Sequence, residues 1–164
     1  MHISYLADHP EFIGTLVSWS VEQWRFVLPE DTTAIRTAKF QAHLNRDVLP
    51  IAWIAHSEDE VFGMAALRAY DLEGREDLTP WLGGVLVGPP FRRRGIGTAL
   101  CRVVEDKAYA LGVRTLYLFT LDRQAWYVTS GWSIIEPCSW RGHPGNIMQK
   151  QLYAAQHCAA ADRR

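Results

Sequence analysis

The stretch that decides the fold runs from Val85 to Leu111 and reads VLVGPPFRRRGIGTALCRVVEDKAYAL. Its first apolar run ends at Pro89-Pro90, and because proline cannot donate a hydrogen bond to a neighbouring strand, a strand ends there. From Ile96 onward, apolar residues recur at positions 96, 99, 100, 103, 104, 108 and 111, the spacing of a helix with one buried face. The stretch therefore predicts a strand, a tight loop and an amphipathic helix.

The loop between this strand and this helix has the composition of an anion site. It carries three arginines, Arg92 to Arg94, followed by Gly95 and Gly97. Glycine lets backbone N–H groups approach a ligand closely, and the positive end of the helix dipole favours an anion. A nucleotide triphosphatase loop fits less well, since no Gly-Lys-Ser/Thr follows, and a dinucleotide fold needs a third glycine where Leu100 stands.

Length and composition limit the kinds of protein that this chain can be. With 164 residues, 48% hydrophobic and 21% charged, the chain predicts one globular domain over residues 1–153 and a weakly held tail over 154–164. The net charge of −1 argues against general affinity for nucleic acid. No apolar run approaches the roughly 20 residues that span a bilayer, so we expect no membrane partner. The odd number of cysteines, without paired spacing, favours a reducing cytoplasm. Three cysteines without metal-ligand spacing predict no metal.

Apolar periodicity along the rest of the chain favours strands and helices that alternate without a strict βαβ repeat, which indicates an α/β (α+β) mixed sheet flanked by helices. A polar turn at 57–60 predicts a hairpin, and Gly83-Gly84 inside a strand predicts a bulge or a close backbone approach. Asp122 is expected to cap a short helix, and the segment 136–146 is expected to be a glycine- and proline-rich insert between closing strands at 132–135 and 147–152.

Two motifs in this chain resemble those of one known family. Arg92-x-x-Gly95-x-Gly97, after a strand that ends in Val85-Leu86-Val87, resembles the acetyl-coenzyme A loop of the GNAT (GCN5-related) N-acetyltransferases. Further on, the segment from Trp126 to Trp132, WYVTSGW, is similar to their aromatic-Tyr-x-x-x-Gly-aromatic signature. The resemblance covers residues 3 to about 152. It implies a central mixed, mostly antiparallel, splayed sheet of about seven strands flanked by about four helices.

The resemblance implies acetyl-CoA as cosubstrate, with its pantetheine arm paired to the backbone of one strand and its pyrophosphate wrapped by the loop that follows. The residues implied are Val85, Leu86 and Val87 for pantetheine, and Arg92, Arg93, Arg94, Gly95, Ile96, Gly97 and Thr98 for the phosphates. Many relatives carry an asparagine after the fifth strand. This chain has Thr120 there, which becomes the candidate substitute.

Family members transfer the acetyl group directly to an amine in a ternary complex, and this implies an acid and a base. Tyr127 is the candidate general acid for the leaving thiolate; the alternative is a tyrosine that only packs against the core. The acidic stretch 71–80 supplies Asp71 and Glu76 as candidate bases for the acceptor amine, and the alternative is a solvated loop.

By family analogy, residues 26–33 and an insert at 139–146 with Trp140 flank the acceptor. Aromatic and acidic neighbours predict a cationic amine: a small polyamine-like compound, an amino sugar or a peptide amine. The function expected is therefore an acyltransferase that acetylates a primary amine, and the protein is a monomer or a homodimer. The alternative is a non-catalytic acyl-CoA-binding sensor or scaffold.

Overall fold

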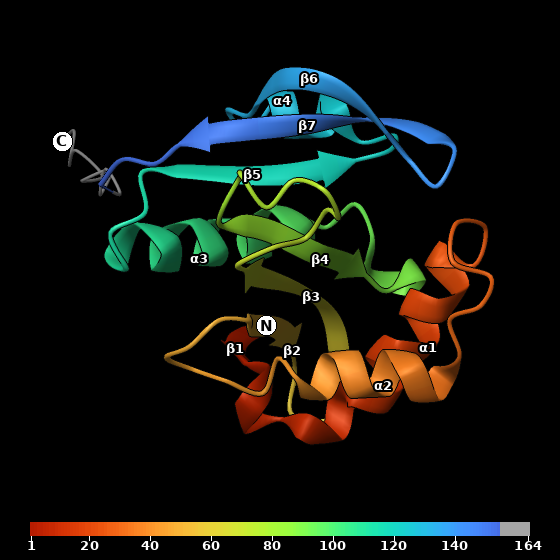
Figure 1. Cartoon of the computed structure of the whole chain (residues 1–164). Coiled ribbons are helices and arrows are strands. Elements are labelled where there is room, and N and C mark those ends of the chain that lie inside the picture. Colours follow the sequence, from red (N-terminus) through yellow and green to blue (C-terminus); the bar gives the residue numbers. More distant parts are fainter. Residues whose placement is uncertain (155–164) are drawn as a thin grey trace, which may run out of the picture.

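Seven strands and four helices make up the computed structural model, which describes residues 1–154 (Figure 1). The sheet has the order β1-β2-β3-β4-β5-β7-β6, and every neighbouring pair is antiparallel except β4 and β5. The strands are β1 (His2–Tyr5), β2 (Ile51–His56), β3 (Val61–Arg68), β4 (Trp81–Val87), β5 (Thr115–Thr120), β6 (Ser133–Trp140) and β7 (His143–Gln151). The helices are α1 (Ile13–Trp24), α2 (Thr33–Gln41), α3 (Ile96–Ala110) and α4 (Gln124–Val128). Over residues 1–154, no helix is both long and apolar enough to cross a membrane.

The core lies on both faces of the central strands. All six residues of β2 are buried, and they alternate between two apolar clusters: Trp53 faces the cluster that holds α3, whereas Ile54 faces the cluster that holds α1 and α2. Successive side chains of a strand point to opposite faces, so a strand covered on both sides reads as a continuous apolar run. The periodicity of α3 is confirmed, because Ile96, Leu100 and Val104 are all buried against this sheet.

The sheet opens between β4 and β5. These parallel strands share one register pair, Trp81 with Tyr117, and a hydrogen bond from the Tyr117 N–H to the Pro80 carbonyl at 3.1 Å. Beyond this point the strands separate, so the carboxyl-terminal halves of β4 and β5 line a cleft instead of pairing. The mixed, splayed sheet expected from the sequence is confirmed.

The expected insert at 136–146 is wrong. β6 continues to Trp140 and β7 begins at His143, so this segment is a hairpin closed by Arg141-Gly142. Both turn residues have positive φ, +50° and +80°, which suits the right-handed twist of a two-residue hairpin turn. Pro137 is tolerated because β6 is the edge strand of the sheet, and Pro144 lies in β7 before Asn146, where the pairing of β7 with β5 begins.

The cap expected at Asp122 is also wrong. The residue that precedes α4 is Arg123, and no side chain of that residue caps the helix. The Thr120 hydroxyl accepts a hydrogen bond from the Arg123 N–H at 2.9 Å instead, which leaves Asp122 exposed in the turn. By contrast, α2 has a side-chain cap, because the Thr32 hydroxyl accepts from the Ile35 N–H at 3.1 Å.

Candidate active site

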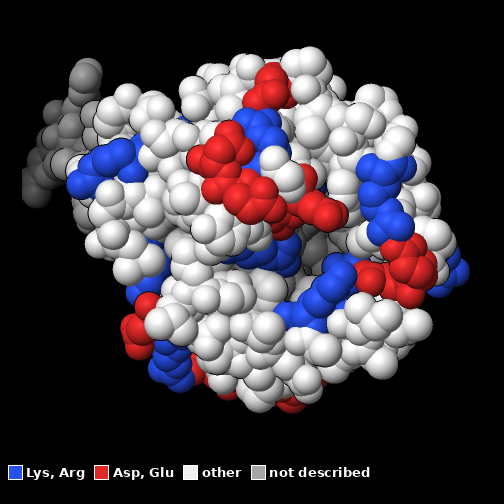
Figure 2. All heavy atoms as spheres, in the orientation of Figure 1, with Lys and Arg blue, Asp and Glu red and all other residues white. Residues whose placement is uncertain are grey.

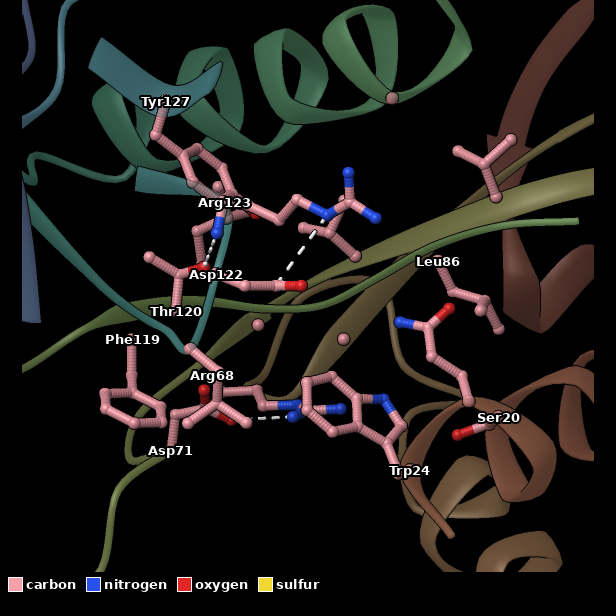
Figure 3. A pocket seen from close by; sticks show the side chains of 18 of the residues that line it. Ser20, Trp24, Arg68, Asp71, Leu86, Phe119, Thr120, Asp122, Arg123 and Tyr127 are labelled. Carbon is pink, nitrogen blue, oxygen red and sulfur yellow. Dashed lines mark hydrogen bonds and ion pairs between the residues drawn. The ribbon is translucent and has the colours of Figure 1, made fainter. Parts of the chain in front are cut away.

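A cleft of about 970 Å³ follows the opening between β4 and β5 and reaches α1 and α2. Its lining includes β4 from Leu82 to Val87, the start of α3, the end of β5 and the side chains of α4. Figure 3 shows Tyr127 and Arg123 at one end, and Arg68, Asp71, Trp24 and Phe119 at the other. The volume is at the upper end of the usual range for small-molecule sites, about 300–1,000 Å³.

A bulge in β4 interrupts pairing with β3 at the middle of the cleft. Met64 pairs with Leu86 and Ala66 pairs with Gly83, so two residues of β4, Gly84 and Val85, stand opposite one residue of β3. Gly84 has a φ of +59°, which only glycine adopts without strain. The bulge expected at Gly83-Gly84 is confirmed. Gly84 and Val85, which have no ladder partner on β3, line the cleft.

The loop before α3 has the backbone shape of an anion site. Arg93 and Gly95 have positive φ values of +63° and +75°, and α3 begins without a side-chain cap. The first helical hydrogen bond runs from the Ala99 N–H to the Gly95 carbonyl at 3.0 Å, so the N–H groups of 96–98 have no acceptor within the helix. These groups line the cleft, as the phosphate prediction requires.

The three arginines of this loop are placed differently. The Arg92 side chain folds back, and its Nε donates to the Val87 carbonyl at 3.1 Å. Arg93 lines the cleft as well, whereas Arg94 lies over the ring of Phe91 and is not part of the lining. Gly97 faces Trp126: a Cβ at that position would lie 3.3 Å from the indole.

Tyr127 lies on α4 with its ring in contact with Trp126 and Trp132, at centroid distances of 4.7 and 6.0 Å. The side chain is buried and lines the cleft, and its hydroxyl makes no hydrogen bond within the described residues. Burial raises the pKa of this phenol, and the nearby Cys101 thiol raises it further. The group therefore carries its proton at neutral pH.

Thr120, the candidate substitute for the family asparagine, is buried and lines the cleft. Its oxygen already accepts from the Arg123 N–H. Since a hydroxyl can also donate one hydrogen bond, that O–H remains available to a ligand.

The two candidate bases lie in different surroundings. Asp71 lines the cleft, and its Oδ1 accepts from Nη1 of Arg68 at 2.6 Å. Glu76 accepts from the Gly74 N–H at 3.2 Å in an exposed turn and is not part of the cleft lining. Next to it, Arg75 binds Asp77 and Glu136, so much of the acidic stretch forms its own surface network.

Sequence reasoning missed four basic residues at the end of the cleft near α2 and the end of β3: Arg36, Lys39, His43 and Arg68. Arg68 ends β3, and a Cβ on Gly84 would lie 2.7 Å from its Nη2. The double glycine in β4 thus marks a close approach by an arginine as well as a bulge. In the sequence, the only indication for Arg68 is that it is the single charged residue at the end of the apolar run 61–68.

Aromatic side chains line the same end of the cleft. Trp140 of β6 contacts Trp24 of α1 and Phe119 of β5 at centroid distances of 6.2 and 6.1 Å. Phe26 contacts His143 at 5.3 Å, edge to face. The segment after α1 and the β6–β7 hairpin, expected to flank the acceptor, therefore touch each other.

Among the described residues, no three His, Cys, Asp or Glu side chains are close enough together to hold a metal ion.

The comparisons with solved structures identify the fold. An aminoglycoside 6′-acetyltransferase type Ii superposes with a TM-score of 0.71 at 23% identity over 93% of this chain and 98% of that one. An aminoglycoside 6′-N-acetyltransferase complexed with coenzyme A superposes with a TM-score of 0.70 at 21% identity, again over 93% of this chain and 98% of that one. A ribosomal-protein-alanine N-acetyltransferase from Brucella melitensis gives 0.69 at 19% identity, over 93% of this chain and 100% of that one.

A curated relative adds similarity in sequence. An amino-acid acetyltransferase of Ralstonia nicotianae is 31% identical over 88 residues, which are 54% of this chain and 18% of that protein. The matched part thus spans about a fifth of the relative. The sequence model of the acetyltransferase (GNAT) family matches residues 13–128, which include β4, the arginine-glycine loop, α3 and Tyr127. The chain therefore belongs to the acetyltransferase (GNAT) family.

Proposed function

We propose that the protein transfers the acetyl group of acetyl-CoA to a primary amine by direct attack in a ternary complex. The observation that carries the proposal is the continuity of the cleft. It joins a loop suited to phosphates, a bulged strand with free backbone groups, a protonated tyrosine and a separate polar end. Structural neighbours with coenzyme A and the family assignment support the choice of cosubstrate.

In this proposal, acetyl-CoA lies along the cleft from α3 toward Arg68. The N–H groups of Ile96, Gly97 and Thr98 receive its pyrophosphate, with Arg92 and Arg93 beside them. The backbone of Val85, Leu86 and Val87 pairs with pantetheine, and the Thr120 hydroxyl donates to the same ligand. Arg94, which lies over Phe91 outside the cleft lining, attracts the phosphates only through its positive charge.

The proposed reaction starts from an ammonium ion, which first loses one proton to Asp71 or to water. The neutral amine attacks the thioester carbonyl carbon, a C–N bond forms, and the C–S bond breaks. Tyr127 gives its proton to the departing sulfur and regains one when the attacking nitrogen loses its second proton. A backbone N–H freed by the bulge stabilises the carbonyl oxygen during attack. Overall, an ammonium ion and acetyl-CoA give an amide, CoA and one proton. Of the two candidate bases we retain Asp71, because Glu76 does not line the cleft.

The test combines binding with turnover. Calorimetry should show acetyl-CoA binding, and a thiol reagent should show CoA release with some amines of a panel of amino acids, polyamines, amino sugars and peptides. Gly97→Trp should weaken acetyl-CoA binding at least about tenfold, because the new side chain fills the space next to Trp126 and Val87. Gly14→Trp, at an open position on α1, is the matched control.

Binding of acetyl-CoA without turnover of any amine would favour an acyl-CoA sensor over an enzyme. Unchanged affinity in Gly97→Trp would show that the phosphates bind elsewhere.

A further inference from the structure

The acceptor end of the cleft is cationic. The charged side chains that line it, within the described residues, are Arg36, Lys39 and Arg68, against the carboxylate of Asp71. The carboxylate of Asp31 forms ion pairs with both Arg36 and Lys39, so three cations face two carboxylates. Figure 2 shows basic side chains at the border of a hollow on this face, beneath a band of acidic ones. His43 adds no charge, because burial and the nearby Arg68 lower its pKa to about 4. The excess of basic side chains differs from the carboxylate-rich pocket that the sequence suggested.

Arg68 is held in place by partners on two of its three nitrogens. Its Nε donates to Nε2 of His43 at 2.9 Å, and its Nη1 donates to Asp71 at 2.6 Å. Nδ1 of His43 in turn donates to the Lys39 carbonyl at 2.8 Å, and this leaves Nε2 as the acceptor that Arg68 needs. The third nitrogen, Nη2, has no hydrogen bond within the described residues and lies against Gly84. It is a positioned cationic donor beside the β4 bulge.

Arg36 supplies a second guanidinium. The residue is nine-tenths buried and lines the cleft, and Asp31 binds its Nη2. Its Nε is buried without any hydrogen-bond partner. Burial lowers the pKa of Arg36, the carboxylate of Asp31 opposes this effect, and the positive charge of Arg68 lowers the pKa further, so the two guanidiniums repel each other across this end of the cleft. An anion bound here would relieve that repulsion and satisfy unused donors.

A neutral apolar surface lies next to these cations. Trp140 contacts both Trp24 and Phe119, and all three rings line the same end of the cleft. In Figure 3 Trp24 and Phe119 lie on either side of the Arg68–Asp71 pair. The pair itself presents a guanidinium nitrogen and a carboxylate side by side, which complements a ligand that carries both an anion and an ammonium group.

We propose that the acceptor amine bears a carboxylate on the adjacent carbon, as in a free α-amino acid with an apolar or aromatic side chain. The inference rests on the acetyltransferase function proposed above. Nη2 of Arg68 binds the carboxylate, and Asp71 faces the ammonium group. The aromatic wall of Trp24, Phe119 and Trp140 holds the side chain. Since Nη2 lies against the β4 bulge, an amine one carbon away is next to the proposed thioester position.

The same charges select against a polycationic acceptor. A polyamine or a multiply charged amino sugar would bring several ammonium groups to Arg68 and to Arg36 and Lys39, which share the single carboxylate of Asp31. Like charges juxtaposed in a partly buried site are unfavourable, so such compounds should be poor acceptors.

The experiment compares amines that differ only in the carboxylate. The probes are L-phenylalanine, L-phenylalaninamide, which imitates a peptide amino terminus, and 2-phenylethylamine; spermidine tests the polycation. We expect kcat/KM for L-phenylalanine to exceed that of both monoamines without a carboxylate by about 10- to 100-fold, the range of a hydrogen bond to a charged group. Equal or reversed preference would overturn the inference while leaving the acetyltransferase proposal intact.

Two variants test whether Arg68 causes the preference for an amine with a carboxylate. Arg68→Met should reduce the ratio of L-phenylalanine to 2-phenylethylamine toward one, with acetyl-CoA affinity unchanged; Arg102→Met, an exposed α3 arginine outside the cleft, should keep the wild-type ratio. A ratio that survives Arg68→Met would overturn the assignment.

If no amine of the panel is acetylated, the proposed function fails, and calorimetry with CoA-loaded wild-type protein decides the inference. Binding of L-phenylalanine but not of 2-phenylethylamine retains it. Equal binding of both, or of neither, rejects it.

Discussion

At the scale of single residues, Tyr127 is the side chain on which the proposed chemistry depends. Its ring is fixed by contacts with Trp126 and Trp132, and its hydroxyl has no partner within the described residues. Tyr127→Phe keeps those ring contacts and removes only the proton donor. We expect kcat to fall by about 10²- to 10⁴-fold, the usual contribution of general acid catalysis, with acetyl-CoA affinity unchanged.

Steady-state kinetics and calorimetry on the same preparation check this prediction. Tyr153→Phe, at an exposed position outside the cleft, is the control. Wild-type turnover in Tyr127→Phe would mean that the thiolate takes its proton from water or another group.

His43 gives a pH dependence to stability. Its folded pKa, about 4, lies below the ordinary value of 6.5, because burial and then Arg68 disfavour the charged ring. Between these two pH values the unfolded chain binds a proton that the folded chain does not. The free energy of unfolding should therefore fall as the pH falls from 6.5 to 4, by at most about 1.4 kcal/mol per pH unit from this residue.

Urea unfolding of wild type and His43→Gln at several pH values between 4 and 7 measures the effect. The variant lacks the titrating ring, so its stability should depend less steeply on pH in this window, while every other histidine contributes equally to both proteins. Parallel curves would show that His43 titrates normally.

At the scale of elements, the β4 bulge sets both the backbone geometry and the position of Arg68. Gly84 has positive φ, and a Cβ there would meet Nη2 of Arg68 at 2.7 Å. Gly74 has positive φ too, +82°, but a Cβ there meets nothing within 4 Å. Comparing alanine at both positions separates backbone strain from contact with Arg68.

Gly74→Ala should cost about 1–2 kcal/mol of unfolding free energy, the penalty for a left-handed residue with a Cβ. Gly84→Ala should cost at least about 1 kcal/mol more, because Arg68 must also move. Chemical denaturation checks the difference. An equal loss of unfolding free energy in the two variants would mean that Arg68 does not contact the residue at position 84.

At the scale of the whole molecule, the acceptor end exists only because distant segments meet. The segment after α1 reaches the β6–β7 hairpin, where Glu30 binds Arg141 and Phe26 contacts His143. Trp140 lies at this junction and also contacts Phe119. The cosubstrate end, by contrast, is formed by β4, α3 and α4.

Because the two ends are formed separately, they should respond separately to substitution. Trp140→Ala should raise KM for the acceptor by about tenfold, through lost apolar contact, and leave acetyl-CoA affinity unchanged. Ser139→Ala, the exposed neighbour on β6, is the control. A matching loss of acetyl-CoA affinity in Trp140→Ala would show that the cleft acts as one unit. Kinetics at saturating acetyl-CoA and calorimetry provide the two readouts.

The sequence by itself determined the fold class, the family and the loop proposed for the cosubstrate. These features are local: strand, loop and helix occupy one continuous stretch from Val85 to Leu111, where proline, glycine and apolar spacing act within a few residues. The Gly83-Gly84 bulge was predictable for the same reason, since a glycine pair inside an apolar strand has few other causes.

Only the tertiary structure decided the acceptor end. Arg36 and His43 come from α2 and the segment after it, Arg68 ends β3, and Trp140 ends β6; no spacing in the sequence indicates that these residues share one cavity. The tertiary structure also pairs the Asp71 carboxylate with Arg68. It makes the segment 136–146 a hairpin, because that segment lies at the edge of the sheet. Charge in a pocket is a sum over residues far apart in the chain, and the fold alone brings them together.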